Sequence, residues 1–361
     1  MFKKSLSYIG VDIGTTGIKV VELQRVAGKP RLINYGYSEE INDFAGRKLQ
    51  LDIPKAGFLV KKICEDSKIS SKNAVAAMPS FAVFSSVINV SNVSEKDMDT
   101  SVMWEAKKVI PLDLDEMIID WKIISKPKEK EKESSGDKSG EDEKEADKKN
   151  SVKVLLTGAP KILVNKYVEI FKAAQLNLLS LETEMFSLVR SLIGIDPSVI
   201  AIIDWGAINT DITIIENSLP MFSRSLDIGG IMVTKAIADS LQVDYKRAEQ
   251  FKLDLNNASQ SDKEELPKII IDNISPIINE IKYSFTLFQQ ENNKKIEKVI
   301  LSGGGANLVG LATYLSEFLN INVVLSDPWT KVEYPLDLKS VLEDIGPKMA
   351  IAVGLALREV S

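Results

Sequence analysis

Histidine is absent from this chain of 361 residues, and cysteine occurs once, at Cys64. Without histidine, no Ser-His-Asp or Cys-His catalytic arrangement can form, and a zinc site with histidine ligands is excluded. One cysteine cannot form a disulfide within the chain, which fits a reducing compartment. Phosphoryl-transfer chemistry survives these exclusions, because it relies on backbone amides, carboxylates and Mg²⁺.

Long apolar runs are lacking too. The late run Met349–Leu357 has about half the length that a membrane-spanning helix needs. Near the N-terminus, Asp12 interrupts the apolar segment that follows Lys3 and Lys4, so we expect no signal peptide. The formal net charge of −6 argues against a surface built for nucleic acid. These features predict a cytoplasmic protein that neither inserts into a membrane nor binds nucleic acid.

Two similar β-rich segments suggest two lobes, and a hydrophobic content of 44% is enough for sizeable cores. Tyr8–Asp12 and Lys19–Gln24 flank a Gly-Thr-Thr-Gly turn, which predicts a hairpin. Val199–Asp204 and Ile212–Glu216 repeat that pattern around a second Asp-x-Gly turn. The chain therefore carries a weak internal duplication.

Composition and periodicity divide the chain further. We expect a first lobe over residues 1–80, completed by about 179–198 and 346–361, and a second lobe over 199–345 with a smaller helical subdomain at about 240–295. Residues 81–178 form a separate α/β module in the order strand, helix, strand, strand, helix. Its segment 126–150 contains no aromatic or β-branched residue, so we expect a solvated, disordered loop there, with a regulatory or partner-binding tail as the alternative.

The first hairpin turn is a candidate phosphate site. Gly14 leaves backbone amides open to phosphate oxygens, and the hydroxyls of Thr15 and Thr16 add donors. Asp12 would not face phosphate directly, because like charges repel, so we expect it to hold Mg²⁺ through water. Taken alone, such a hairpin is more often structural than functional.

The second hairpin turn repeats this chemistry with Asp204, Gly206, Asn209 and Thr210. Two such turns facing each other would clamp the β- and γ-phosphates of a nucleotide, with Mg²⁺ between Asp12 and Asp204. The occurrence of both turns makes the functional interpretation the stronger one.

A glycine loop follows the apolar strand Val299–Leu301 and comprises Ser302, Gly303, Gly304 and Gly305. Three consecutive glycines would let a flat ring lie against the backbone, although an ordinary strand-to-helix turn is the alternative. We expect the following helix to begin near Asn307. The loop lacks the Lys-Ser or Lys-Thr of a P-loop, which sets Walker-type nucleotide hydrolases aside.

Three charged residues complete the candidate site. Glu249 and Lys252 are three positions apart and share a helix face, so they form either a surface ion pair or a ribose-binding pair. Glu184 opens a helix, where its carboxylate could orient an attacking or Mg²⁺-bound water, or merely complement the helix dipole. Glu184 and Asp204 are the candidate catalytic carboxylates.

In their order along the chain, these motifs resemble the superfamily of actin, heat-shock chaperones and sugar kinases. Longer stretches resemble more closely the PilM family of type IV pilus assembly proteins, which is related to the cell-division protein FtsA. The resemblance covers nearly the whole chain and is carried by the segments YIGVDIGTTGIKVVEL, MWEAKKVIPLDLDEMIIDWKII, VLLTGAPKILVNKYVEIFKAAQL, FSRSLDIGG and IAVGLALR.

The resemblance implies an actin-like ATPase fold of class α/β, with two RNase H-like lobes around a nucleotide cleft and a small inserted subdomain of the FtsA type. It implies Mg²⁺-ATP at the hairpins and the glycine loop, with hydrolysis slow at most. It further implies a scaffold at the cytoplasmic face of the inner membrane that binds the cytoplasmic N-terminal peptide of a PilN-like protein. The implied groove lies between the first subdomain and the module that contains Trp104, Pro111 and Trp121.

Two alternatives and one departure accompany this interpretation. An FtsA-like filament former and a metabolite kinase share the superfamily, and pilus motor or platform proteins are further candidate partners. We find no sugar-binding cluster, and no amphipathic helix of the FtsA type follows the closing helix, which favours recruitment through a partner. Trp205 stands where a small aliphatic residue is usual, which raises the question whether the second hairpin packs differently.

Overall fold

A computed structural model describes most of the chain, and the segment 126–150 lies outside the described residues. The described residues are 6–38, 52–91, 95–125, 151–258 and 266–360. They form two compact units: unit 1 comprises Met1–Phe81 and Lys166–Ser361, and unit 2 comprises Ala82–Asn165. The finer subdomain boundaries expected from the sequence stay predictions.

The first sheet of unit 1 has the strand order β3-β2-β1-β4-β8. Its strands are β1 (Ser7–Ile13), β2 (Ile18–Val26), β3 (Lys29–Tyr37), β4 (Asn73–Met78) and β8 (Asn177–Thr183). β1, β2 and β3 are antiparallel neighbours, whereas β4 and β8 run parallel to β1. Ala27 and Gly28 both have positive φ, 51° and 85°, as a two-residue turn between twisted strands requires.

The second sheet repeats the first strand for strand, in the order β11-β10-β9-β12-β13. Its strands are β9 (Ile200–Trp205), β10 (Thr210–Glu216), β11 (Leu219–Leu226), β12 (Lys298–Ser302) and β13 (Asn322–Leu325). Asn217 and Ser218 supply the same pair of positive φ angles, 51° and 60°, between β10 and β11. The duplication predicted from two hairpins therefore extends to whole sheets.

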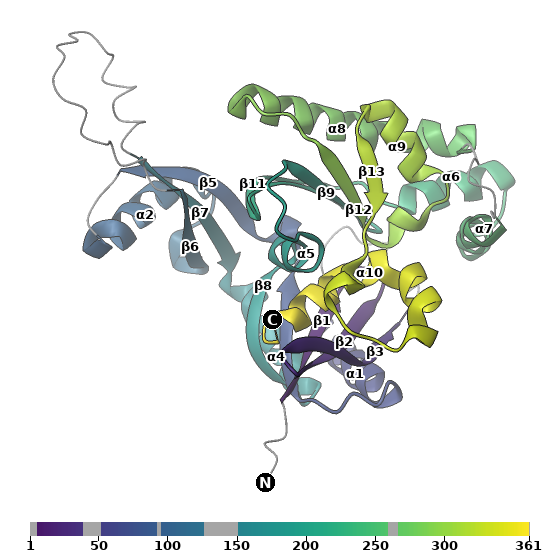
Figure 1. Cartoon of the computed structure of the whole chain (residues 1–361), viewed down its shortest axis with the longest axis horizontal. Coiled ribbons are helices and arrows are strands. Elements are labelled where there is room, and N and C mark those ends of the chain that lie inside the picture. The colour runs from purple at the N-terminus through teal and green to yellow at the C-terminus, as the bar shows by residue number, and fades with distance from the viewer. Residues whose placement is uncertain (1–5, 39–51, 92–94, 126–150, 259–265, 361) are drawn as a thin grey trace. The chain divides into compact units, whose positions relative to one another are not determined.

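Eight helices among the described residues belong wholly or partly to unit 1 (Figure 1). They are α1 (Ile53–Asp66), α4 (Lys161–Ala173), α5 (Glu184–Leu192), α6 (Ile231–Leu241), α7 (Tyr245–Ala258), α8 (Lys268–Asn292), α9 (Leu311–Leu319) and α10 (Lys339–Leu357). The short 3₁₀ helices are η1 (Ser80–Ala82), η2 (Leu114–Glu116), η3 (Gly304–Asn307), η4 (Pro328–Lys331) and η5 (Leu336–Leu338).

Helix α10 is buried along its second half, from Met349 to Leu357. On one side, Val353 and Leu357 pack with Val21 and Leu23 of β2. On another, Ile351 and Leu355 share a core with residues of both sheets: Val75, Ala77, Ile200, Ile202 and Ile300. The apolar run that was too short to span a membrane is thus the helix that joins the two sheets (Figure 1).

Unit 2 is a three-stranded antiparallel sheet, in the order β5-β7-β6, with one helix. Its elements are β5 (Phe84–Ser91), α2 (Glu95–Val109), β6 (Met117–Ser125) and β7 (Ser151–Pro160). Met98, Val102 and Ala106, four residues apart on α2, pack against the sheet around Val154. The helix ends two residues before Pro111, which disfavours a helical conformation in the residue that precedes it. The order strand, helix, strand, strand, helix predicted for residues 81–178 is confirmed by β5, α2, β6, β7 and α4, of which α4 continues from unit 2 into unit 1.

Glycine allows α10 to approach its neighbours closely. A Cβ on Gly10 would lie 2.0 Å from the carbonyl oxygen of Ala352, and one on Gly354 would lie 2.0 Å from that of Ser187. Both neighbours are backbone atoms of helices, which cannot move aside as a flexible side chain would. These two glycines therefore set the distance of α10 from β1 and from α5.

Gly10→Ala is accordingly expected to destabilise the protein by about 2–3 kcal/mol through overpacking. Gly194→Ala is the matched control, because a Cβ there would have no heavy atom within 4 Å. It should change the free energy of unfolding by less than about 0.5 kcal/mol. Urea denaturation of both variants measures the difference, and equal midpoints would contradict the close packing of α10.

Candidate functional site

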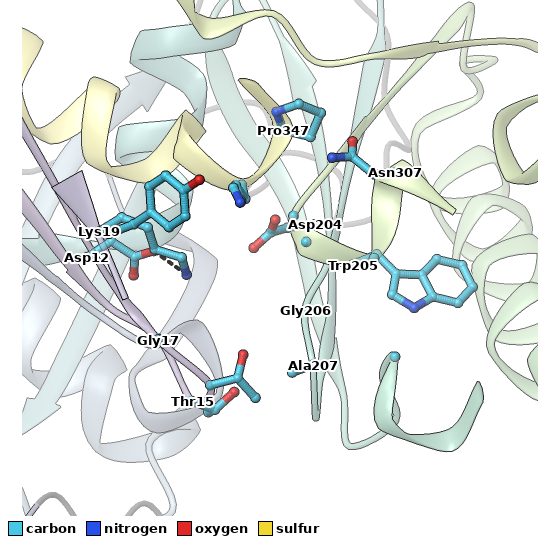
Figure 2. Close-up of a pocket in the computed structure, with 18 of the residues that line it drawn as sticks. Asp12, Thr15, Gly17, Lys19, Asp204, Trp205, Gly206, Ala207, Asn307 and Pro347 are labelled. Atoms are coloured by element: carbon cyan, nitrogen blue, oxygen red, sulfur yellow. Dashed lines mark hydrogen bonds and ion pairs between the residues drawn. The ribbon is translucent and has the colours of Figure 1, made fainter. Parts of the chain in front are cut away.

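The two hairpin turns and the glycine loop line one cavity of about 830 Å³ within unit 1 (Figure 2). Among the residues predicted from the sequence, those that line it are Asp12, Gly14, Thr15, Thr16, Glu184, Asp204, Gly206, Asn209, Glu249, Lys252, Gly303, Gly304 and Gly305. Residues that are up to 293 positions apart in the chain, from Asp12 to Gly305, therefore meet at one site. Their individual roles stay predictions.

The two hairpin turns are built alike. The amide of Gly14 donates a hydrogen bond to the carbonyl of Gly17 at 3.0 Å, and the amide of Gly206 donates to that of Asn209 at 2.9 Å. The aspartates stand at equivalent places, but their cross-strand neighbours differ. Asp12 is paired with Lys19, whereas Asp204 is paired with Asp211. The duplicated backbone thus carries an asymmetric distribution of charge.

Lys19 is a residue of the cavity that sequence reasoning missed. Its ammonium lies 3.1 Å from a carboxylate oxygen of Asp12 (Figure 2). Burial lowers the pKa of Lys19, but the carboxylates of Asp12, Asp204 and Glu184 outweigh it and raise the pKa above the ordinary value. The available signal was the hairpin itself, because residues paired across two antiparallel strands face the same side.

Asp204 points into the cavity from the side opposite Asp12 and Lys19 (Figure 2). Burial, and then the charges of Asp211 and Asp12, raise its pKa to about 7, and Lys19 offsets only part of this shift. Burial also raises the pKa of Asp211 to about 6. Asp211 accepts a hydrogen bond of 2.7 Å from the Asn209 amide, and its Oδ1 has no partner among the described residues.

Glu184 begins helix α5 and is buried at the same cavity. Its Oε2 accepts hydrogen bonds from the amide and the hydroxyl of Ser80, at 2.9 and 3.4 Å. Burial raises its pKa well above the ordinary value, and the charges of Asp211, Asp12 and Asp204 raise it further. Glu184 therefore lies in the first turn of α5, where it can complement the helix dipole, and also in a cluster of mutually repelling carboxylates.

This cluster has an excess of negative charge that a cation would relieve. Lys19 is the positively charged neighbour of Asp12, Asp204 and Glu184, and Asp211 adds a further negative charge near Asp204 and Glu184. No three acidic or cysteine side chains among the described residues are arranged to bind a metal ion directly. The donor set therefore fits a hydrated divalent cation better than one bound only by side chains.

The glycine loop is shaped by Trp205, which is 1% exposed and lies in the core of the second sheet. A Cβ on Gly303 would lie 2.5 Å from the Trp205 carbonyl oxygen, and one on Gly305 would lie 2.3 Å from the indole ring. Only a Cβ on Gly304 would meet open space. Two of the three glycines thus accommodate Trp205, which leaves Gly304 as the position free to approach a ligand.

Trp205 does not distort the second hairpin. The pairing of β9 with β10 runs without a register shift from Trp205 opposite Thr210 to Ile200 opposite Ile215. The expectation of a helix from Asn307 is wrong, because the short helix η3 comes first and α9 begins only at Leu311. The positive φ of Gly310, 79°, ends the intervening turn.

Thr210 and Ser302 are the predicted residues that do not line the cavity. Both are fully buried. The Thr210 hydroxyl donates to the carbonyl of Ile228 at 2.7 Å, and that of Ser302 donates to the carbonyl of Pro347 at 3.2 Å. Their hydrogen bonds hold the turn and the glycine loop in place from behind.

The glycine loop is tied to α10 at two further points. The Gly303 amide donates to the carbonyl of Pro347 at 3.0 Å, and the Asn307 side-chain amide donates to that of Asp344 at 2.9 Å. Also at the cavity, the Lys348 ammonium lies 4.0 Å from the centre of the Tyr37 ring. Sequence reasoning missed Tyr37, Pro347 and Lys348, because they lie in segments without a recognisable motif.

Glu249 and Lys252 form a partly buried ion pair at the cavity wall. Their side chains, 20% and 18% exposed, approach to 2.7 Å. The Lys252 ammonium also donates to the Thr234 hydroxyl at 2.9 Å, and that hydroxyl bonds to Glu249. The surface-pair interpretation is therefore too simple, because Thr234 on α6 holds both side chains of α7 in position.

Comparisons with known proteins extend over nearly the whole chain. The family model described as type IV pilus assembly protein PilM matches residues 10–137 and 140–360. A solved PilM–PilN type IV pilus biogenesis complex contains a chain that is 25% identical, with a TM-score of 0.81 and 98% of both chains covered. Cell division protein FtsA of Enterococcus faecalis is 22% identical over 360 residues, which cover 90% of this chain and 79% of FtsA.

More distant structures share the fold alone. The ethanolamine utilization protein EutJ of Carboxydothermus hydrogenoformans is 16% identical with a TM-score of 0.57, and covers 97% of this chain and 89% of its own. MreB5 of Spiroplasma citri, solved with ADP, is 14% identical with a TM-score of 0.51, and covers 99% of this chain and 97% of its own. The predicted α/β class and actin-like fold are confirmed.

The raised pKa of Asp204 predicts a specific pH dependence of stability. The folded state favours the protonated carboxyl group of Asp204. The free energy of unfolding therefore falls as the pH rises from the ordinary pKa of 3.8 to about 7, because the buried group must then ionise. Asp204→Asn should therefore exceed the wild type in stability by on the order of 2 kcal/mol at pH 8 and match it near pH 4. Asp196→Asn, at an exposed carboxylate with a lowered pKa, is the control and should give no gain at pH 8. Thermal unfolding across this pH range measures both, and a pH-independent difference would contradict the assignment.

Proposed function

The chain belongs to the family of the type IV pilus assembly protein PilM, and from this premise we propose that it is a nucleotide-binding scaffold of the pilus assembly platform. The single observation that carries the proposal is the cavity formed by two equivalent hairpin turns and a glycine loop. The match of the family model to residues 10–137 and 140–360 supports the pilus setting.

The proposed ligand is ATP with Mg²⁺. The turns at Gly14 and Gly206 would hold the phosphates through backbone amides, and Lys19 on β2 would supply a positive charge beside them. Asp12 and Asp204 would hold Mg²⁺ through water, which neutralises the repulsion that raises the pKa of Asp204. A protein of the same fold, MreB5 of Spiroplasma citri, was solved with ADP.

The ribose and base would lie on the other side of the glycine loop. Glu249 and Lys252, held by Thr234, present one acceptor and one donor suited to ribose hydroxyls. Gly304 is the part of the loop where a base could approach the backbone most closely. These assignments follow from the chemistry of the lining residues.

We propose that hydrolysis is slow at most. Glu184 and Asp204 are the candidate catalytic carboxylates, and burial raises the pKa of each above the ordinary value, to about 7 for Asp204. A protonated carboxyl group cannot accept a proton from water, so the protonated fraction of each group would not act as a base.

The proposed partner is the cytoplasmic N-terminal peptide of a PilN-like membrane protein. The structure of a PilM–PilN complex, similar over 98% of both chains, supports this partner. Among the described helices, none has the length and apolarity needed to cross a membrane. We propose that the partner holds this protein at the cytoplasmic face of the inner membrane.

Within unit 2, Trp104 is the first residue to test for the partner. Its side chain is 65% exposed on α2, where the Lys108 ammonium lies 6.0 Å from the ring centre. Trp121 is less available, because its indole N–H donates to Asp99 at 3.1 Å. Exposed tryptophans are frequent anchors of protein interfaces.

The FtsA-like filament former remains the second candidate, supported by relatives that are 22% and 24% identical. Sedimentation with and without Mg²⁺-ATP separates it from a non-polymerising scaffold. For the metabolite kinase, rapid ATP turnover that depends on a small sugar would be the distinguishing result.

Nucleotide binding is tested by charge removal at the two turns. Asp12→Asn and Asp204→Asn should each weaken Mg²⁺-ATP binding about tenfold or more, because the hydrated metal loses one of the two carboxylates that would hold it. Lys19→Met should weaken binding with or without Mg²⁺, since its charge faces phosphate. Glu333→Gln, an exposed carboxylate that pairs with Lys29 and Arg31, is the control. Calorimetric titration measures all four, and unchanged affinity in both aspartate variants would show the assignment of the cavity to be wrong.

Partner binding is tested with a synthetic N-terminal peptide of the PilN-like protein from the same gene cluster. We expect binding to the full chain, and Trp104→Ala should reduce the affinity about tenfold if the ring is an anchor. Phe318→Ala, at a half-exposed aromatic side chain of unit 1, is the matched control. Fluorescence anisotropy with and without Mg²⁺-ATP gives the affinities, and no binding in either condition would rule out the pilus scaffold.

A further inference from the structure

Ser38 directly follows strand β3 and lines the cavity beside the first hairpin turn. Its amide donates a hydrogen bond to the carbonyl of Ile18 at 2.9 Å, and its hydroxyl oxygen accepts one from the Ile18 amide at 3.3 Å. Ile18 is the first residue of β2 and comes directly after the turn. Main chain and side chain together therefore fix Ser38 to the strand that leaves the turn.

Glycine lets the turn itself approach Ser38. A Cβ on Gly17, the last residue of the turn, would lie 2.2 Å from the Ser38 carbonyl oxygen. At the other end of the turn, a Cβ on Gly14 would lie 2.9 Å from the Lys19 ammonium. The turn thus packs closely against Ser38 at one end and against Lys19 at the other, and both of these residues line the cavity.

The contacts of Ser38 leave one polar group over. Its amide and its hydroxyl oxygen are both bonded to Ile18, and its carbonyl oxygen lies against Gly17. Among the residues that the structure describes, none accepts a hydrogen bond from the Ser38 hydroxyl. Because a serine hydroxyl can donate as well as accept, its proton is available to an acceptor bound in the cavity.

Two other hydroxyl groups beside the cavity are arranged differently. The Thr210 hydroxyl donates to the carbonyl of Ile228, and the Ser302 hydroxyl donates to the carbonyl of Pro347. Neither residue lines the cavity, whereas Ser38 does. Ser38 therefore combines two properties that these residues lack: a place in the cavity wall, and a hydroxyl proton that no described residue accepts.

A phosphate oxygen is the acceptor whose chemistry fits this position. The Lys19 ammonium lies 3.1 Å from a carboxylate oxygen of Asp12, so the charge of the nearest carboxylate is balanced beside the turn. Glycine turns bind phosphate through backbone amides and neighbouring hydroxyls, because several donors can share one group of oxygens. A hydroxyl that donates to an ionised oxygen forms a stronger hydrogen bond than one that donates to a neutral acceptor.

We propose that Ser38 is a phosphate-binding residue of the cavity, whose hydroxyl is held by the Ile18 amide and donates to a phosphate oxygen of the nucleotide. This inference rests on the proposed function, since it requires that a nucleotide binds in the cavity. It adds a donor from β3, outside both hairpin turns and the glycine loop. Three successive strands, β1, β2 and β3, then contribute to one phosphate site.

The test is calorimetric titration of the full chain with Mg²⁺-ATP and Mg²⁺-ADP. Ser38→Ala should weaken the binding of ATP about tenfold, because a hydrogen bond to a charged group is lost. In the same nucleotide-free variant, the Gly14 amide should keep its wild-type rate of hydrogen exchange, measured by NMR. That amide closes the turn by its bond to Gly17, so its protection reports whether the turn is intact.

Ser316→Ala is the matched control. The Ser316 hydroxyl oxygen also accepts a hydrogen bond from a backbone amide, that of Val323 at 3.0 Å, but Ser316 does not line the cavity. This variant loses the same kind of structural bond as Ser38→Ala, and it should bind both nucleotides with the wild-type affinity.

Unchanged affinity for both nucleotides in Ser38→Ala would overturn the inference. So would an exchange rate of the Gly14 amide that rises in Ser38→Ala by as large a factor as the affinity falls, because Ser38 would then only support the turn. Failure of the wild-type protein to bind either nucleotide would instead refute the proposed function.

Discussion

The packing of helix α10 is the constraint on which the rest of unit 1 depends. Its buried half joins the cores of both sheets, and the glycines at positions 10 and 354 let its backbone touch β1 and α5. Two residues before this half, the Pro347 carbonyl accepts the hydrogen bonds of Gly303 and Ser302. One helix therefore positions the strand that carries Asp12 and also the glycine loop on the opposite side of the cavity. Any shift of α10 would change the separation of the two phosphate turns.

Within that frame, a duplicated backbone carries unequal charges. The hairpins share their turn geometry and their strand order, yet Lys19 faces Asp12 while Asp211 faces Asp204. The first turn is thus nearly neutral and the second has an excess of negative charge, which adds to the effect of burial in raising the pKa of Asp204 to about 7. Buried charges of one sign weaken a folded protein, and they persist where a ligand or an ion is needed to balance them. The asymmetry is a physical reason to expect that a cation would stabilise the second turn more than the first.

The cavity by itself belongs to a whole superfamily, as its similarity to EutJ and MreB5 in fold illustrates. Membership in the PilM family is what relates this chain to pilus assembly. Unit 2 interrupts unit 1 along the chain, and the first connection to it follows Pro79 and Phe81, which line the cavity.

The sequence by itself determined the two Asp-x-Gly hairpins, the strand before the glycine loop, the order of elements in unit 2 and the family, because turn chemistry and apolar periodicity are local properties of the chain. Most of the site residues that it named also line the cavity, since many of these sit in or beside recognisable turns. Only the tertiary structure decided which of these residues contact one another. The contacts are Lys19 with Asp12, Ser80 with Glu184, Thr234 with Glu249 and Lys252, and Trp205 with Gly305. It also removed Thr210 and Ser302 from the cavity wall, where the motif alone had put them. A motif records which residues follow one another, whereas burial, charge balance and hydrogen-bond partners depend on segments that meet only after the chain has folded.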